Sequence, residues 1–522
     1  MPKIVEWRDS ISSKRFCIAK PQASRKMTGE TIQAAPGWQF VRVKIRVILA
    51  ISAAMILPCL WHRQIEAGDL GSHVYNAWLA QLIEKGQAPG LYFVRQWNNV
   101  LFDWMLLHAA NVFGFAVAEK LVVSACVLIF FWGVFAFVAA VSGRPPWLFA
   151  PCIAMLAYGY SFNMGFLNYY LSLGLASFSF AVLWRGRGLE RLLGLLVAPL
   201  ILLAHPIGFL WLAGMALYLL LWTKLPRWWN LLAPLAALTT LFVVHWYLAH
   251  QNRFPVDWVH DAFYLMTGAD QLTLYGQRYA VLGWVALSFG VFCVLVDVIS
   301  RRRDGTFWQS VRLPAELYVV AVVAVALLPE NLRPSISGGW IGLLASRLTA
   351  ICAIFGLCLM CCLKPRKWHL AGFGACAIVF FGFLYQDTLV LNRMESGAEH
   401  LVSRLPLGTR VIATIWAPPD SRVSFIGHIA DRACIGHCFS YANYEPSSGQ
   451  FRIRAHPGSP VVSASDDDTE DMQAGMYDVE EEDLPLKEIF QCDEKDLTKL
   501  CIRDLASGEK NGRLGYKPPA ND

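Results

Sequence analysis

The sequence is dominated by long apolar runs that are separated by short loops, alternately basic and nearly free of lysine and arginine. A helix needs roughly 17 to 25 apolar residues to cross the hydrocarbon core of a bilayer. We therefore expect an all-α polytopic membrane bundle of about eleven transmembrane helices. The expected spans are approximately 46–61, 117–142, 147–162, 167–184, 189–204, 207–222, 230–249, 279–299, 314–329, 341–362 and 368–388.

Lysine and arginine recur in every second loop, and this alternation predicts the orientation of the chain. Arg42, Lys44 and Arg46 precede the first run, and because basic residues of short loops stay in the cytoplasm, we expect a cytoplasmic N-terminus. The later basic loops contain Arg144, Arg185, Arg187, Lys224, Arg227, Arg301, Arg302, Arg303, Lys364, Arg366 and Lys367. An odd number of spans then predicts an extracytoplasmic C-terminus, in the periplasm of a bacterium or in the lumen of a eukaryotic compartment, and we expect a bacterial inner-membrane protein of the cell envelope.

Composition excludes two classes of protein. The chain is 56% hydrophobic and 16% charged, whereas soluble domains contain roughly 25% charged residues, so the lipid bilayer is an expected partner. A net charge of +6 is too small to indicate a nucleic-acid partner. We expect a basic cytoplasmic arm (1–45), a transmembrane domain (46–388) with an outer loop (62–116), and an extracytoplasmic C-terminal domain (389–522). Within the outer loop, polar residues interrupt the apolar segment 98–116, which favours an interfacial helix over a span.

The C-terminal domain is expected to be a small α/β appendage. Apolar and polar residues alternate over 401–463 in short runs bounded by Pro and Gly, which is typical of strands. The segment 466–483 is rich in Asp and Glu and lacks Lys and Arg, which predicts a solvated or disordered acidic loop. The alternative, a site for a divalent cation or a cationic partner, lacks the regular spacing of a calcium loop.

Four cysteines lie in this C-terminal domain, namely Cys434, Cys438, Cys492 and Cys501. An even number in an oxidising compartment indicates two disulfides, and three pairings are possible. Local pairs, 434–438 and 492–501, are the simplest. A zinc site beside His437 is an alternative that lacks the paired spacing of a zinc ribbon.

A polar cluster follows the first apolar run and contains Glu66, Asp69 and His73. If a helix starts near Gly68, Asp69 and His73 lie at positions i and i+4 on one face. Such a face could hold a divalent cation, or place a general base beside an acceptor hydroxyl. In the alternative interpretation Asp69 only caps the N-terminus of the helix.

The order of elements after this cluster is distinctive. An amphipathic helix is expected over 72–84, the residues Gly86-Gln-Ala-Pro-Gly90 break it, and the interfacial helix precedes the next span at Ala118-Glu-Lys-Leu121. Over about residues 45–225 this order resembles the GT-C superfamily of integral membrane glycosyltransferases. That family, which includes mannosyl- and arabinosyltransferases, uses polyprenyl-phosphate-linked sugars.

The resemblance implies both a fold and a reaction. The bundle would be GT-C-like, and it would transfer a hexosyl or pentosyl group from a polyprenyl-phosphate-linked sugar to an unknown extracytoplasmic acceptor. Asp69 would correspond to the acidic residue of the first outer loop, acting as general base or assisting a divalent cation. Glu66 would be the second carboxylate, although the family often has two acidic residues closer together. Inverting transfer needs one carboxylate for the nucleophile and a cation for the leaving phosphate.

Candidates for binding the substrate occur at the expected outer ends of later spans. Arg347 lies just inside such an end, where a charge usually faces a polar cavity or a partner, so we expect it to bind phosphate. Its alternative is snorkelling to the interface. The other candidates are His73, Asn163, Asn168, Tyr169, His205 and Arg333. Their ordinary roles would be in turns, in the aromatic belt or as solvated charges.

Two other classes of function remain open at this point. A transporter or flippase would place ionisable groups near the membrane midplane, but the expected spans contain few of them. A non-catalytic membrane protein could instead display its C-terminal domain to a partner. The transferase hypothesis predicts that Asp69, His205 and Arg347 converge.

Overall fold

The structure, a computed structural model, describes most of the chain. The described residues are 37–186, 189–224, 231–259, 265–333, 341–418, 420–424, 427–493 and 496–512. The chain divides into two compact units, Met1–Ser52 and Ala53–Asp522. Helix α1 (Gly37–Leu60) begins in the first unit and ends in the second. Residues 1–36 of the expected cytoplasmic arm lie outside the described residues. The other described helices and all the described strands belong to the second unit.

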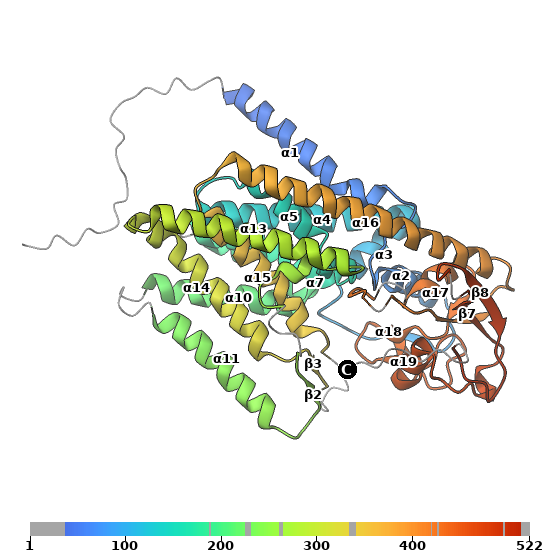
Figure 1. The fold of residues 1–522 in the computed structure, drawn as a ribbon. Coiled ribbons are helices and arrows are strands. Elements are labelled where there is room, and N and C mark those ends of the chain that lie inside the picture. The colour runs from blue at the N-terminus through green and yellow to red at the C-terminus, as the bar shows by residue number, and fades with distance from the viewer. Residues whose placement is uncertain are drawn as a thin grey trace, which may run out of the picture. The chain divides into compact units, whose positions relative to one another are not determined.

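Seven described helices are long and apolar enough to cross a membrane. They are α4 (Phe115–Ser142), α7 (Leu167–Arg185), α11 (Leu232–His250), α13 (Gln277–Arg301), α14 (Gly305–Leu327), α15 (Leu344–Cys361) and α16 (Lys367–Val402). A shorter apolar helix, α10 (Pro206–Lys224), packs between them against α7. The chain is therefore a multi-pass helical membrane protein (Figure 1).

Two of the expected spans are interrupted helices. Segment 147–162 forms η1 (Trp147–Phe149), α5 (Ala150–Ala157) and α6 (Tyr160–Asn163), because the backbone is extended at Gly159. Segment 189–204 forms α8 (Leu189–Leu195) and α9 (Ala198–Ala204), which restarts with a proline in its first turn. Proline is tolerated there because the first N–H groups of a helix have no partner within it. The count of eleven spans thus stays a prediction.

Helices α4 and α7 form the most closely packed pair of the bundle. A Cβ atom on Gly133 of α4 would lie 2.3 Å from the carbonyl oxygen of Gly174 on α7. A Cβ on Gly174 would lie 2.8 Å from the backbone of Phe130. The two backbones therefore touch at positions where only glycine fits, as is common between membrane helices.

The outer loop forms two helices, α2 (Leu70–Glu84) and α3 (Leu101–Phe113). With 13 residues, α3 is about 20 Å long, which is too short to cross the hydrocarbon core. Gly114, whose φ is +77°, separates α3 from α4 and lets the chain change direction. These features suit the interfacial helix that the sequence predicts.

The C-terminal domain is built on a four-stranded sheet with the order β5 (Phe439–Ser440), β4 (Arg410–Thr414), β7 (Leu486–Gln491) and β8 (Leu500–Asp504). Strand β4 pairs in parallel with β5 and β7, and β8 is antiparallel to β7. Helices α17 (Ile429–Cys434) and α19 (Asp466–Ala474) pack against β4. A core that includes Ile412, Met472 and Leu486 lies between α19 and the sheet.

The expectation of a solvated or disordered acidic loop is wrong for its first part, which is helix α19. The hydroxyl of Ser465 caps this helix by accepting from the N–H of Asp468, at 3.2 Å. Acidic residues in the first turn interact favourably with the positive end of the helix dipole. Met472 is fully buried beneath the helix. This apolar side chain sets which face of the acidic helix α19 packs against the domain.

A continuous helix and a pair of strands join the C-terminal domain to the rest of the unit, and two disulfides lie within the domain. Helix α16 continues past the expected membrane boundary and contacts β8 (Figure 1). Strand β1 (Leu91–Phe93) of the outer loop pairs with β6 (Ile453–Ala455) of the C-terminal domain. The structure also forms the two local disulfides, Cys434–Cys438 and Cys492–Cys501.

Candidate functional site

Asp69 is held at the start of α2 by the turn between α6 and α7. The N–H of Gly68 donates to the carbonyl of Asn163 at 2.7 Å, and the N–H of Asp69 donates to that of Met164 at 3.0 Å. Gly165 has φ +79°, and a Cβ there would lie 2.3 Å from the nitrogen of Asp69. The turn can therefore approach Asp69 only because glycine occupies that position.

The carboxylate of Asp69 does not serve as a helix cap. Asp69 occupies the N-cap position of α2, but its side chain accepts no hydrogen bond from the helix backbone. Its Oδ1 instead lies 3.5 Å from Nε2 of His428, whose Nδ1 lies 2.9 Å from Oδ2 of Asp431. The side chain of Asp69 is 27% exposed and that of Asp431 only 3%. His428 thus bridges a buried carboxylate and an accessible one.

His428 carries a positive charge in this arrangement. Burial disfavours that charge, but hydrogen bonds to Asp431 and Asp69 raise the pKa of His428 to about 10. The imidazolium therefore fixes the orientation of the Asp69 carboxylate at neutral pH. We name Asp69, His428 and Asp431 the first centre.

A second imidazole lies one helical turn along α2. Nδ1 of His73 lies 2.6 Å from Oδ1 of Asp103 on α3 and 3.8 Å from Oε1 of Glu445 in α18 (Tyr444–Ser447). The amide of Asn168 donates to Oδ2 of Asp103 at 2.8 Å. Burial opposes the charge, but Asp103 raises the pKa of His73 to about 9. Asp103, His73 and Glu445 form the second centre.

The two carboxyl groups beside His73 differ in their protonation. Burial favours the neutral form of Asp103, but the His73 imidazolium outweighs it and lowers the pKa of that carboxyl. Burial raises the pKa of Glu445 to about 7. Asp103 is therefore ionised at neutral pH, whereas Glu445 is close to its midpoint.

The role of Asp69 and His73 as ligands of a divalent cation stays a prediction. In this structure Asp69 contacts His428 and His73 contacts Asp103. Among the described residues, no group of three or more His, Cys, Asp or Glu side chains has a geometry that could hold a metal ion. The charges around α2 pair with one another instead.

Arg347 lies in the first turn of α15, close to the first centre. Its guanidinium carbon is 4.2 Å from the centroid of the Phe166 ring. Of the charged groups that attract this guanidinium, Asp69 acts most strongly. Its Nε is buried and has no hydrogen-bond partner in the described part of the chain. Arg347 is thus a cation with an unused donor near the accessible carboxylate.

Tyr169 connects Arg347 with His205. Its hydroxyl donates to the carbonyl of Arg347 at 2.6 Å, and its ring meets the His205 ring edge to face at 5.3 Å. The charge of Arg347 also acts on His205. Arg347 therefore lies within electrostatic reach of both Asp69 and His205, and the convergence of all three side chains stays a prediction.

The two asparagines expected to bind sugar are used by the protein itself. The amide of Asn163 donates to the carbonyls of Tyr158 and Gly159, and its oxygen accepts from Tyr275 at 2.8 Å. Besides holding Asp103, Asn168 accepts from the N–H of Phe102. Both side chains position the site, and their polar atoms are engaged within the protein.

Glu66 belongs to a separate buried network. Its Oε1 accepts from the amide of Asn392 at 2.5 Å. Arg432 lies 3.4 Å from both Glu119 and Glu395 in the same network. Burial and the charge of Glu395 raise the pKa of Glu66 well above its ordinary value. Glu66 thus helps to join the outer loop to α4, α16 and α17, and it is not placed beside Asp69.

Arg333 lies apart from both centres. It is exposed after β3 (Asn331–Leu332), and its N–H donates to the carbonyl of Pro255. Its charge acts on Asp466 of α19.

Several residues of both centres come from the C-terminal domain, where sequence reasoning did not seek them. They are His428, Asp431, Tyr444 and Glu445, together with Arg452 near the second centre. The only local signal is the spacing of His428 and Asp431, which suits one helical turn. Nothing in that spacing indicates Asp69 as the third member.

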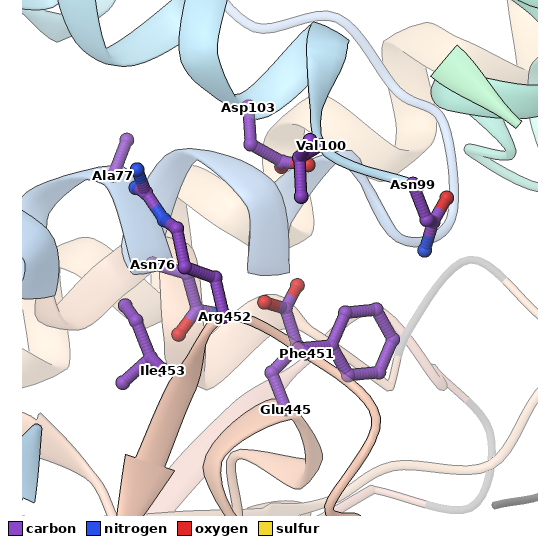
Figure 2. Close-up of a pocket in the computed structure, with 9 residues that line it drawn as sticks. All are labelled: Asn76, Ala77, Asn99, Val100, Asp103, Glu445, Phe451, Arg452 and Ile453. Carbon is purple, nitrogen blue, oxygen red and sulfur yellow. The ribbon is translucent and has the colours of Figure 1, made fainter. Parts of the chain in front are cut away.

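A small hollow lies beside the second centre, with a cavity volume of about 20 Å³, which is room for about one water molecule. Glu445, Phe451 and Arg452 of the C-terminal domain meet Asn99 and Asp103 of the outer loop across it (Figure 2). Asn76, Ala77, Val100 and Ile453 complete its lining.

Comparison with known protein families, with characterised proteins and with solved structures gave no match for this chain. The function is therefore argued from the residues and geometry of the site.

Proposed function

We propose that the protein is a membrane glycosyltransferase of GT-C type that transfers a hexosyl or pentosyl group from a polyprenyl phosphate to an extracytoplasmic acceptor. One observation carries this proposal. The accessible carboxylate of Asp69 is oriented by a buried imidazolium, His428, and lies within the electrostatic reach of Arg347, a guanidinium with an unused buried donor.

The proposed reaction inverts the configuration of the sugar. Asp69 takes the proton of an acceptor hydroxyl as that oxygen bonds to the anomeric carbon. The bond between the anomeric carbon and the phosphate oxygen breaks, and its electron pair leaves with the polyprenyl phosphate. Arg347 stabilises the negative charge of the leaving phosphate. His428 is a positioning residue that holds the Asp69 carboxylate toward the acceptor.

In this proposal the GT-C-like bundle has eleven spans, a cytoplasmic N-terminus and an extracytoplasmic C-terminal domain. The site then lies at the outer membrane surface, where a lipid-linked donor can present its phosphate to Arg347 from the bilayer. The position of His428 and Asp431 supports a catalytic role for the C-terminal domain over mere display to a partner, because display would not require contact with Asp69.

The test is transfer of labelled sugar by membranes that contain the full chain, with polyprenyl-phosphate-linked mannose and arabinose as donors and an extract of cell-envelope glycans as acceptor. Asp69→Asn is expected to lower the turnover by about 10²- to 10⁴-fold, the usual contribution of a general base. The matched control is Asp467→Asn, which makes the same change on the exposed face of α19.

Asp69→Asn should insert into membranes and fold, because Asp69 caps nothing and Asp431 still contacts His428; its unfolding temperature should be slightly lower, since the charge beside His428 is lost. Transfer at the wild-type rate by this variant would disprove the assignment of the base. Failure of the wild-type chain to use either donor would contradict the proposed donor class.

A further inference from the structure

We infer that two basic loops at one end of the bundle together bind the headgroup of an anionic phospholipid of the bilayer. The loops are 302–304, between α13 and α14, and 362–366, between α15 and α16. Arg347 lies in the first turn of α15, whereas the second loop follows the last turn of that helix. This end of the bundle is therefore remote from the proposed transfer site, and the inference does not rest on the proposed function.

Asp297, near the end of α13, joins the two loops. Its side chain is only 3% exposed, and its Oδ2 accepts from the N–H of Lys364 at 3.0 Å and lies 3.4 Å from the guanidinium of Arg301. Its Oδ1 lies 3.7 Å from the guanidinium of Arg366. A buried carboxylate is stable only when it is paired, and here its partners come from the end of α13 and from the second loop. The two loops are thus held side by side.

Some of the basic side chains at this end are used within the protein. Arg144 donates to two carbonyls at the end of α15, and Arg185 donates to one near the end of α4. Both interactions compensate the negative end of a helix dipole. Arg301 and Arg366 pair with Asp297. These four charges need no further anion.

Four other cations are not compensated in this way, and we name them the basic surface. Their side chains are exposed, and none forms an ion pair within the part of the chain that the structure describes: Arg302, Arg303, Lys364 and Lys367. Retention of basic loops in the cytoplasm accounts for lysine and arginine at the ends of spans, but not for two such loops being held together. Like charges that lie close together repel, so a bound anion would stabilise this arrangement.

An exposed apolar face of α13 adjoins the basic surface. Phe292, Leu295 and Ile299 are 54%, 52% and 67% exposed, and their spacing places them on one face of the helix. The ring of Trp368, at the start of α16, lies 5.8 Å from that of Phe292, and the guanidinium carbon of Arg366 lies 6.0 Å from the Trp368 ring. Cations and apolar side chains therefore adjoin where α13 and α16 pack together (Figure 1).

This combination fits an amphiphile better than a small anion. The phosphate of an anionic phospholipid can accept hydrogen bonds from arginine and lysine, while its acyl chains pack along the apolar face of α13. A free phosphate would use only the cations. Because α13 and α16 are long and apolar enough to cross a membrane, lipid headgroups surround their ends. An anionic phospholipid is thus the occupant that matches both the charge and the apolar face.

The test measures lipid binding to the full chain in detergent micelles by native mass spectrometry. The probes are phosphatidylglycerol, phosphatidylcholine with the same acyl chains, and inorganic phosphate. Phosphatidylglycerol is expected to bind about a hundredfold more tightly than phosphatidylcholine, because each basic residue near an anionic headgroup contributes roughly three- to fivefold. Inorganic phosphate at millimolar concentration should not displace it.

Two double variants locate the bound lipid, one in each loop. Arg302→Gln with Arg303→Gln, and Lys364→Gln with Lys367→Gln, should each weaken phosphatidylglycerol about tenfold and leave phosphatidylcholine unchanged. All four side chains are exposed, so both variants should fold. Unfolding temperatures followed by tryptophan fluorescence check this.

The matched control removes two exposed cations from the other end of the bundle. Arg253 follows α11 and Arg333 follows α14, and His245 of α11 contacts the carbonyl of Leu327 at the end of α14, so both arginines lie at that end. Arg253→Gln with Arg333→Gln lowers the net charge as much as each loop variant does. It should bind phosphatidylglycerol as the wild type does.

Several results would overturn the inference. Equal binding of the two phospholipids would show that the headgroup charge is not recognised, and an equal loss in the control would show that only net charge matters. Displacement by inorganic phosphate would indicate a site for small anions. Unchanged binding in either loop variant would contradict a site that both loops share.

Discussion

The two centres on α2 contain the same kinds of side chain, but their carboxyl groups differ in accessibility and in their partners. In each, one buried imidazolium lies between two carboxyl groups. In the first centre the outer carboxylate, Asp69, is 27% exposed and has no second cation bonded to it, while Arg347 acts on it from nearby. In the second, Asp103 is tied to His73 and Asn168, and Glu445 is close to its midpoint.

This difference in accessibility favours Asp69 as the carboxyl group that reacts in the proposed transfer. A general base needs an accessible oxygen and a fixed orientation, and Asp69 has both. Glu445 is only 6% exposed and its Oε1 lies 3.8 Å from Nδ1 of His73, so it is less accessible to a substrate. We therefore propose that the reaction takes place at the first centre, while the second centre holds α2, α3 and the C-terminal domain together.

The largest expected effect separates the two carboxyl groups by steady-state kinetics. Asp69→Asn should lower kcat by about 10²- to 10⁴-fold while the acceptor KM stays near the wild-type value. Glu445→Gln should change kcat little, because Glu445 pairs with His73 and not with Asp69. A loss of kcat in Glu445→Gln as large as that in Asp69→Asn would contradict the division of roles.

The next effect concerns the positioning role of His428. His428→Gln removes the imidazolium and should lower kcat about tenfold to a hundredfold, since Asp69 is no longer held in one orientation. The acceptor KM should be unchanged, and the pH profile of kcat should shift because the charge beside the base is gone. His400→Gln, at an exposed position on α16, is the control. A raised KM with wild-type kcat would place His428 in acceptor binding.

The two imidazoles also predict how stability depends on pH. Their pKa values, about 9 for His73 and about 10 for His428, lie above the ordinary value of 6.5, so folding favours the charged form. The resulting stability is fully present below pH 6.5 and is lost as the pH rises through about 9 and 10. Unfolding temperatures measured from pH 6 to 10.5 should fall over this window. If the unfolding temperature of His428→Gln falls as steeply with pH as that of the wild type, another group is responsible for the pH dependence.

The smallest expected effect is the pH dependence that Glu445 gives to the second centre. Burial raises the pKa of Glu445 to about 7, and the groups facing it are His73 of α2, Asp103 of α3, His428 before α17 and Arg452 before β6. Because folding favours the neutral carboxyl, the contribution of Glu445 to stability should fall as the pH rises from about 4.5 to about 7. Glu445→Gln should reduce the slope of the unfolding temperature over this pH range.

The sequence predicted the membrane helices well where apolar runs are long and uninterrupted. Segments 147–162 and 189–204 are also apolar runs. A turn at Gly159 divides the first segment, and a new helix that starts just before Pro199 divides the second. Average hydropathy does not detect such breaks, because it ignores where backbone hydrogen bonds are interrupted. The acidic helix α19 was missed for a related reason, since a serine cap and one buried methionine outweigh its charge.

Half of the candidate site could be predicted from sequence. Asp69, His205 and Arg347 stand out as polar residues beside apolar runs, and such residues are costly unless they have a role. His428 and Glu445 lie in an ordinary polar domain, where a histidine or a glutamate attracts no notice. Their importance arises only from the fold, which brings that domain against α2.

The joint construction of the site has a consequence for biosynthesis. The ribosome completes Asp69 and Arg347 well before it reaches His428 and Glu445, so the growing chain carries an unfinished site while its helices enter the membrane. Both centres are complete only after the C-terminal domain has folded onto α2 and joined β6 to β1.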